Sequence, residues 1–370
     1  MNLTAELRRS LNIVTEFLMP SRAENRAIPS LDGGLAANDA IDSLRAHWSS
    51  TEEEPDDMAP AGEHSVLFTV GRAVHGLDLR SGQTSQVASL PGPASAICAD
   101  GSGGHFVAVE GEGLHRLTAR DGRVTRVSEH PLSCATSLTC VDGSVYVTQG
   151  STGFSAQQWA HDLMSKGASG SLLRIDLSSG RAKTLASGLA WPAGVTAGPT
   201  GSTLLVSESW RHRVLTFDLN GGAGRTLLPN LPGYPMRLSP DGRGGYLLAF
   251  MALRTHLIDF VLREDYFREE MVRTVPPQFW ISPALRSTGE RWEPLQIGSM
   301  KHLNQTKPWA PSRAYGLLAQ MEPDGTFTRS WHARTGSART GITSAHAVGG
   351  RIVMVSKGGR MVLAEQEEPR

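Results

Sequence analysis

The 370-residue chain carries no net charge and is rich in glycine, with 36 basic residues, 36 acidic residues and 40 glycines. Without a basic field, nucleic acid is not expected as a partner, and the glycines favour many turns. The three cysteines lack CxxC spacing, which argues against a disulfide framework or a thiolate zinc site and favours a reducing, cytoplasmic location. No apolar run reaches about eighteen residues, so no transmembrane segment is predicted.

Residues 1–62 are predicted to precede the main domain. Within 1–20, apolar residues recur at helical spacing: Leu3, Leu7, Leu11, Val14 and Leu18. We expect a helix there, ended by Pro20 and packed on the outside of the domain; a helix lying on a membrane surface is the alternative. A turn at 31–34 is compatible with a first inner strand. The acidic stretch 50–64, STEEEPDDMAPAGEH, is predicted to be a mobile surface loop.

The rest of the chain repeats one unit, best displayed by residues 170–188, GSLLRIDLSSGRAKTLASG. An alternating apolar run reaches a Ser-Gly turn at Ser179-Gly180, and a second extended run leads away. This pattern is typical of a β-hairpin whose turn glycine adopts positive φ. Equivalent turns carry these glycines: Gly82, Gly122, Gly221 and Gly325.

Six copies of this unit predict an all-β fold, a six-bladed β-propeller over residues 63–370. The turn glycines at 82 and 122, and at 180 and 221, lie about forty residues apart, the length of a four-stranded blade. The alternative is a β-sandwich with several hairpins, which does not need near-equal spacing.

Two insertions interrupt the repeat and are predicted to form helical lids over one mouth of the propeller. The first, 151–166, has apolar residues that suit a short helix. The second, 251–312, begins with a helical pattern and continues as a segment rich in proline and tryptophan. Insertions of this length are usually lids or binding loops, so we expect function beneath them.

Three linked segments then resemble a known family: GSLLRIDLSSGRAKTLASGLAWPAGV, LLVSESWRHRVLTFDL and NLPGYPMRLSPDGRGGYLLAF. They are similar to the strictosidine synthase-like family, part of the group of six-bladed propellers that contains gluconolactonases and paraoxonases. The resemblance covers roughly residues 130–363 and implies the propeller fold. It is less specific for activity, because one fold hosts many chemistries.

The resemblance also implies where calcium would bind in the metal-dependent members of this group. One ligand is the asparagine of a P-N-G-V-like motif, where this chain has Ala193 in Trp191-Pro192-Ala193-Gly194-Val195. Another comes from an Asp-Asn pair after a G-Y-P-like motif, where this chain has Met236 and Arg237. A cation at the second position would repel calcium. We therefore predict no metal and no other cofactor, and we disfavour a calcium-dependent lactonase.

The catalytic glutamate of strictosidine synthase aligns near Thr340-Gly341, and no Glu or Asp occurs from Thr326 to Leu363. The resemblance therefore does not transfer that activity.

Geometric reasoning places ten polar residues at one mouth, because inner-strand starts and the loops after the next strands surround it. These are Asn38, Glu110, Thr148, Gln149, Ser207, Glu208, Arg237, Ser344, His346 and Lys357. Glu208 is the candidate acid/base group, paired with Arg237 across neighbouring blades; a structural ion pair is the alternative. Gln149, Arg237, Ser344 and His346 are candidate substrate-binding residues, with an aromatic wall from Trp191, Trp210 and Tyr234.

These observations favour an enzyme that acts without a metal on a small, partly aromatic or amphiphilic molecule, by hydrolysis or by a lyase or condensation reaction. A non-catalytic binding or scaffold propeller is the alternative, because the positions of the known catalytic groups are replaced. The sequence gives no indication of the oligomeric state.

Overall fold

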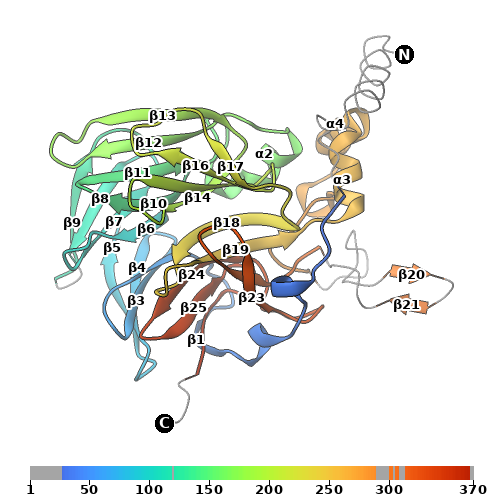
Figure 1. Cartoon of the computed structure of the whole chain (residues 1–370), viewed down its shortest axis with the longest axis horizontal. Helices are drawn as coiled ribbons and strands as arrows, with labels where there is room; N and C mark the ends of the chain where they lie inside the picture. Colours follow the sequence, from blue (N-terminus) through green and yellow to red (C-terminus); the bar gives the residue numbers. More distant parts are fainter. Residues whose placement is uncertain (1–26, 119–120, 289–299, 303–304, 308–312, 367–370) are drawn as a thin grey trace.

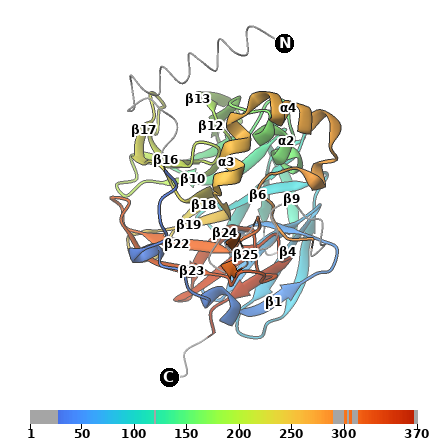
Figure 2. The same cartoon turned by 90° about the vertical axis from the view of Figure 1, so that its right-hand side faces the viewer.

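The computed structural model describes residues 27–118, 121–288, 300–302, 305–307 and 313–366. These residues form six four-stranded antiparallel sheets arranged in a ring (Figures 1 and 2). The innermost strand of each sheet contacts those of its two neighbours, which closes the ring. The predicted six-bladed β-propeller is therefore confirmed. The helix predicted over 1–20 lies outside the described residues.

Four blades are built from consecutive strands, with the innermost strand first. Their strands are β2 (Pro55–Pro60), β3 (Ser65–Val70), β4 (Ala73–Asp78) and β5 (Thr84–Ser89); β6 (Ala94–Ala99), β7 (Gly104–Val109), β8 (Gly113–Thr118) and β9 (Arg123–Ser128); β10 (Ala135–Val141), β11 (Ser144–Gln149), β12 (Gly170–Asp176) and β13 (Ala182–Leu189); β14 (Pro192–Ala197), β15 (Thr203–Glu208), β16 (Arg213–Asp218) and β17 (Arg225–Leu228). The turn glycines 82, 122, 180 and 221 have the expected positive φ.

The fifth blade contains the long insertion, and the sixth closes the ring with a strand from the other end of the chain. Their strands are β18 (Gly233–Pro240), β19 (Tyr246–Leu253), β22 (Leu317–Met321) and β23 (Phe327–His332); β24 (Ile342–Val348), β25 (Arg351–Ser356), β26 (Met361–Ala364) and β1 (Arg45–Ser49). β1 pairs antiparallel with β26 and becomes the outer strand of the last blade.

The acidic stretch 50–64 is not the mobile loop that its composition predicted. Its residues Pro55–Pro60 form β2, the inner strand of the first blade. Asp57, Met58 and Ala59 in this strand are buried. The prediction was wrong because the composition of the stretch masked a short apolar strand core, which packing against neighbouring blades stabilises.

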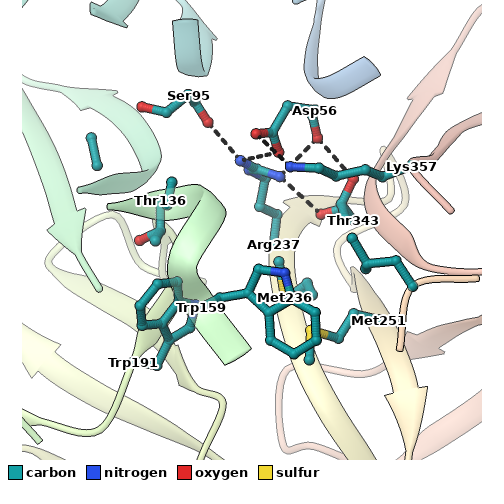
Figure 3. Close-up of a pocket in the computed structure, with 13 residues that line it drawn as sticks. Asp56, Ser95, Thr136, Trp159, Trp191, Met236, Arg237, Met251, Thr343 and Lys357 are labelled. Carbon is teal, nitrogen blue, oxygen red and sulfur yellow. Dashed lines mark hydrogen bonds and ion pairs between the residues drawn. The ribbon is translucent and has the colours of Figure 1, made fainter. Parts of the chain in front are cut away.

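Each inner strand carries a register shift near its start, where it pairs with the second strand of its blade. The shifts fall at equivalent positions of all six described blades: 55–58, 94–96, 135–137, 192–194, 233–238 and 342–344. A bulge re-aims side chains that would otherwise alternate strictly between the two sheet faces. Figure 3 shows four residues from these positions, Asp56, Ser95, Thr136 and Thr343, gathered near Arg237.

The two insertions form helices on the same side of the propeller (Figures 1 and 2). They contain η3 (Ala156–Gln158) and α2 (Trp159–Met164) in the first, and α3 (His256–Arg263), α4 (Asp265–Thr274), η4 (Pro277–Phe279), β20 (Met300–His302) and β21 (Gln305–Lys307) in the second. α4 contacts both α2 and α3. None of the described helices is both long and apolar enough to cross a membrane.

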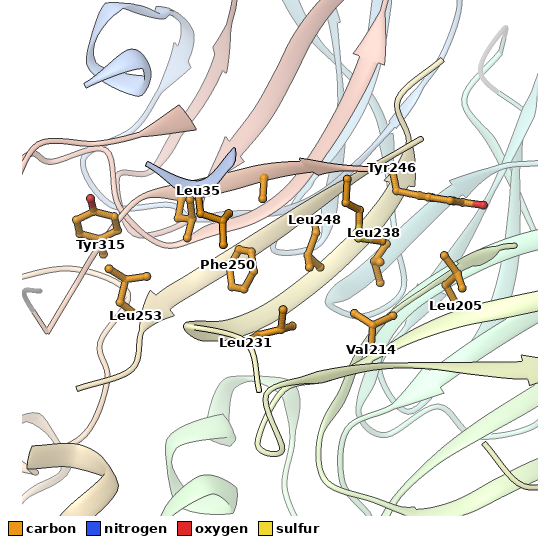
Figure 4. Close-up of a cluster of buried hydrophobic side chains, with 13 residues drawn as sticks. Leu35, Leu205, Val214, Leu231, Leu238, Tyr246, Leu248, Phe250, Leu253 and Tyr315 are labelled. Carbon is orange, nitrogen blue, oxygen red and sulfur yellow. The ribbon is translucent and has the colours of Figure 1, made fainter. Parts of the chain in front are cut away.

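The residues that precede β1 pack against the fifth blade. They form η1 (Gly33–Leu35) and η2 (Ala40–Ser43). Leu35 joins a buried cluster with Phe250, Leu253 and Tyr315 (Figure 4). The N-terminal region is therefore attached to the propeller both through this cluster and through β1.

Next to Tyr315 of this cluster, His332 is buried between two hydroxyl groups. Its Nδ1 lies 3.1 Å from the Tyr315 hydroxyl and its Nε2 lies 3.0 Å from Ser330 Oγ. Burial lowers the pKa of His332 to about 4.

We expect the free energy of unfolding to decrease as pH falls from about 6.5 to about 4, because His332 binds a proton there only in the unfolded chain. The lowered pKa corresponds to up to about 3 kcal/mol. His332→Gln should flatten this pH dependence in urea unfolding followed at several pH values. An unchanged slope in the variant would show that His332 does not titrate as described.

Candidate functional site

An ion cluster lies where the six inner strands approach the propeller axis, with Arg237 of β18 at its centre (Figure 3). The Arg237 Nη2 lies 3.2 Å from Asp56 Oδ1, and its Nε lies 3.2 Å from Asp57 Oδ2. The guanidinium also donates to three backbone carbonyls, at 2.9 Å to Asp56, 2.7 Å to Ser95 and 3.4 Å to Thr343. Arg237 therefore links the inner strands of the first, second, fifth and sixth blades.

Lys357 completes the cluster from the loop after β25. Its Nζ donates to Asp56 Oδ2 at 2.9 Å, so both carboxylate oxygens of Asp56 have a cationic partner. Asp57 instead accepts backbone N–H groups, from Met58 at 2.8 Å and from Ile97 at 2.9 Å. Consecutive strand residues normally face opposite sides, but the bulge in β2 brings Asp56 and Asp57 to the same guanidinium.

The two carboxyl groups respond differently to this environment. Burial alone would raise the pKa of Asp56, but Lys357 and Arg237 together lower it. For Asp57, burial raises the pKa and outweighs the attraction of Arg237. Asp56 is therefore the carboxylate that the two cations hold ionised.

The residues at the axis do not fit a resident calcium ion. Calcium takes six to eight oxygen ligands, and here five oxygens already surround the Arg237 guanidinium. Ala193, which stands where the resemblance implies an asparagine ligand, offers no side-chain donor. The guanidinium holds the place of a bound cation, so we derive no step through a metal.

A small pocket of about 40 Å³ lies on the cap side of this cluster. Asp56, Lys357 and Arg237 are among its polar lining residues, together with Ser95, Thr136 and Thr343. Its apolar lining is Ala135, Ala156, Trp159, Trp191, Met236, Met251 and Leu285. Trp159 comes from α2 and Leu285 from the second insertion, so both insertions contribute to the pocket, as expected for lids.

Trp191 is held rigidly in this wall. Its ring stacks on Trp210, with 5.2 Å between the ring centroids, and its backbone has the unusual φ of 53°. Non-glycine residues rarely adopt this left-handed backbone conformation, and contacts with the surrounding residues must stabilise it. Trp210 does not line the pocket; its Nε1 donates to Asp162 Oδ1 of α2 at 2.8 Å and thereby fixes the first insertion.

A second cavity, of about 220 Å³, lies on the other side of the cluster. It is lined by later residues of the inner strands, including Ser344 and His346, and Arg237 borders both cavities. Ser344 and His346 were predicted at the capped mouth, and the structure places them in this opposite cavity. Burial lowers the pKa of His346 to about 4. The sequence-based prediction placed every listed inner-strand residue at the same mouth. It did not account for how far along the strand each residue lies, which decides the cavity that its side chain lines.

Glu208 does not pair with Arg237, and this part of the prediction was wrong. Its Oε1 accepts from Arg211 Nη1 at 2.7 Å and from the Ala190 N–H at 2.7 Å, and its Oε2 accepts from Arg213 Nε at 2.5 Å. The side chain is fully buried and does not line the capped pocket. The contacts of Glu208 match the alternative, a structural ion pair, and its cationic partners Arg211 and Arg213 come from its own blade.

The remaining candidates also lie outside the pocket lining. Gln149 accepts from the Cys134 N–H through Oε1 at 3.3 Å. Tyr234 is fully buried against Trp210, with 6.0 Å between ring centroids. Among the candidate substrate-binding residues, the structure brings only Arg237 and Trp191 to the capped pocket; Lys357, from the wider set of ten, joins them.

Sequence reasoning missed the two aspartates, which are the partners of Arg237. They lie in a stretch whose composition is typical of an acidic linker. Their position relative to the next blade is the signal that could have identified them. Asp56 lies in the inner strand of its blade, β2, as Met236 and Arg237 lie in the inner strand of theirs, β18. Counting back one blade length from the second blade would have placed a strand at 55–60.

These features define a six-bladed propeller with a charged cluster on its axis and a pocket beneath a helical cap. Residues 61–244 match the family model described as SMP-30/Gluconolactonase/LRE-like region. Over these residues the chain is similar to the SMP-30/gluconolactonase family of propellers.

Comparisons with individual proteins agree with this similarity. The chain is 23% identical over 383 residues to adipocyte plasma membrane-associated protein of Bos taurus, covering 96% of this chain and 86% of that protein. It is 27% identical over 134 residues to strictosidine synthase-like 6 of Arabidopsis thaliana, covering 36% of each. The family resemblance seen in the sequence is thus supported over a limited part of the chain.

Two solved structures share the fold. The calcium-binding protein regucalcin of Agrobacterium tumefaciens superposes with a TM-score of 0.56 at 12% identity, covering 88% of this chain and 96% of that one. A putative gluconolactonase superposes with a TM-score of 0.53 at 12% identity, covering 87% and 90%. At this identity the likeness concerns the fold alone.

Proposed function

We propose that the chain is a metal-independent propeller enzyme that acts on a small, partly aromatic or amphiphilic molecule in the capped pocket. The observation that carries this proposal is the composition of the pocket: a charged floor of Asp56, Arg237 and Lys357 faces an apolar wall that includes Trp159 and Trp191. Pockets of this kind orient an apolar ligand through a few placed polar groups.

The hydrogen bonds of the floor suggest which end of the ligand binds there. Asp56 uses both carboxylate oxygens within the cluster, whereas an ammonium group has three donors and Lys357 spends one of them on Asp56. The unused donors favour a hydrogen-bond acceptor, such as a carbonyl or carboxylate. Since about 40 Å³ holds little more than one water molecule, only the polar end would reach the floor.

Lys357 is in a position to polarise such a carbonyl by hydrogen bonding, and Asp56 keeps the ammonium oriented. In this proposal Lys357 contacts the reacting group, and Asp56 acts as a positioning residue. Arg237 holds β2, which bears Asp56, next to β24 of the blade that carries Lys357.

We expect sodium phenylacetate to raise the melting temperature of the protein more than phenylethylamine does, because the two share a ring but only the first offers an acceptor. At about ten times its dissociation constant a ligand adds about 1.4 kcal/mol of stability. Lys357→Gln should abolish this difference, whereas Lys183→Gln, at an exposed outer-strand position, should keep it. A preference for the amine, or an unchanged response in Lys357→Gln, would contradict the assigned floor.

A non-catalytic binding propeller is the second candidate, and the saturated hydrogen bonding of Asp56 favours it, because no free carboxylate is left to act as a base. Hydrolysis of phenyl acetate separates the two functions. Binding without turnover that depends on Lys357 supports the second candidate.

A further inference from the structure

The large apolar side chains exposed on the described surface concentrate on the second insertion. Leu257 and Phe260 of α3 are 42% and 54% exposed, and Tyr266 and Phe267 of α4 are 83% and 48% exposed. We call these four residues the cap patch. The opposite sides of the same helices are buried, through Ile258, Val261 and Met271. An apolar surface on an otherwise packed element indicates an interaction site.

The described chain begins near the base of α3. The Asn230 side chain donates to the Ala27 carbonyl at 3.0 Å, and it accepts from Arg254 at 2.8 Å. Arg254 in turn donates to Asp259 of α3 at 2.7 Å. The Arg254–Asp259 contact is a buried ion pair. Three consecutive contacts therefore connect the point where residues 1–26 join the described chain to the base of the cap.

The sequence of the N-terminal segment complements the patch. Its apolar residues form one stripe at helical spacing: Leu3, Leu7, Leu11, Val14 and Leu18. A 20-residue helix is about 30 Å long, longer than α3 or α4, and residues 21–26 supply a linker of up to roughly 20 Å. A stripe of this length, joined by such a linker to the base of α3, is long enough to reach the patch.

Charge favours this occupant over a lipid surface. Residues 256–274 hold five acidic and three basic side chains, so α3 and α4 carry a net charge of −2. Residues 1–26 hold three acidic and four basic side chains, a net charge of +1. An anionic membrane would repel the cap helices, whereas the N-terminal segment has the complementary sign.

We propose that residues 1–20 dock as an amphipathic helix on the cap patch, with the leucine stripe against Phe260, Tyr266 and Phe267. The linker keeps the segment at a high effective concentration, so the contact forms within one chain without a large interface. The docked helix would brace α3 and α4 over the mouth of the propeller. This inference does not depend on the proposed function of the pocket.

A photo-cross-linking amino acid at position 260 of the full chain tests the docking. We expect adducts within one chain to residues 1–20, and a yield that falls roughly tenfold or more in Leu7→Glu/Leu11→Glu, because two buried leucines are replaced by charges. Two controls test the specificity of the adduct. Arg9→Ser, on the polar side of the predicted helix, should leave the yield unchanged. The cross-linking residue placed instead at exposed position Arg273 should give little product.

Three results would overturn the proposal. Adducts between two chains would assign the patch to self-association. A full chain that sediments with vesicles of phosphatidylcholine and phosphatidylglycerol through Phe260 would assign it to a lipid surface. Failure to form any adduct with residues 1–20, while the melting temperature stays at its wild-type value, would leave the patch without this partner.

Discussion

Replacing Arg237 with methionine should lower the free energy of unfolding by roughly 3–5 kcal/mol, because it leaves two buried aspartates without their shared cation. This is a large share of the 5–15 kcal/mol typical of a folded domain. The loss should shrink as pH falls from about 7 to about 5, since the Asp57 carboxyl group, left without a cation and with a pKa raised by burial, then binds a proton in the folded state. Urea unfolding at the two pH values measures both effects.

Two further variants define the cause. Arg237→Lys keeps a positive charge and should lose less stability than Arg237→Met, although a lysine cannot reproduce the five contacts of the guanidinium. Arg225→Met, at an exposed position of β17, should change stability by about 0.5 kcal/mol or less. If Arg237→Met unfolded no more readily than Arg225→Met, the cluster would not stabilise the ring.

The same cluster predicts how the protein responds to calcium. Wild-type protein should show no rise in melting temperature at about 5 mM calcium, because the axial oxygens are bonded to Arg237. Arg237→Ala uncovers those oxygens, which are ligands that calcium prefers, and should gain calcium-dependent stability. A rise of several degrees in the wild type would restore the calcium-dependent alternative.

Glu208→Gln should lower stability by about 2–3 kcal/mol while leaving phenylacetate binding unchanged. The substitution keeps the shape of the side chain but removes the charge that Arg211 and Arg213 share, and hydrogen bonds to charged groups are worth about 1.5–3 kcal/mol each. Arg211 is 42% exposed in its side chain, so Arg211→Gln should cost less than about 1 kcal/mol. Thermal melting and ligand titration on the same samples separate the two roles.

A stable Glu208→Gln variant that had lost turnover would instead restore Glu208 as the acid/base group. The structure offers no route for this, since Glu208 does not line the capped pocket and its oxygens are engaged by three donors.

The fold could be predicted because its signal is periodic. A turn glycine such as Gly180 needs positive φ. The spacing of about forty residues between glycines 82 and 122, and between 180 and 221, gives the blade length. The position of Arg237 near the axis followed from the same count. The partners of Arg237 could not be predicted, because local composition made 50–64 resemble a linker, while the tertiary contacts of β2 with neighbouring blades decide its state.

The charge pairing of Glu208 failed for a related reason. Placing two residues at one mouth does not fix which partner each carboxylate takes, since Arg211 and Arg213 lie within five residues of Glu208 and reach it first. The location of Ser344 and His346 was mispredicted for a similar reason, because the position of a residue along its inner strand decides which of the two cavities it lines. Sequence spacing located the mouth but not the depth of each side chain within it.

The pairing of β1 with β26 means that the ring is fastened by residues made at opposite times during synthesis. Arg45 faces Ala364 in the finished sheet. At about 5–20 residues per second, a ribosome needs roughly 15–60 s to travel between them. Throughout that interval the nascent chain holds an open arc with unpaired strand edges, which are sites for aggregation. The ring therefore closes only when the last strands have been synthesised. We expect the nascent chain to depend most on chaperones just before β26 pairs with β1.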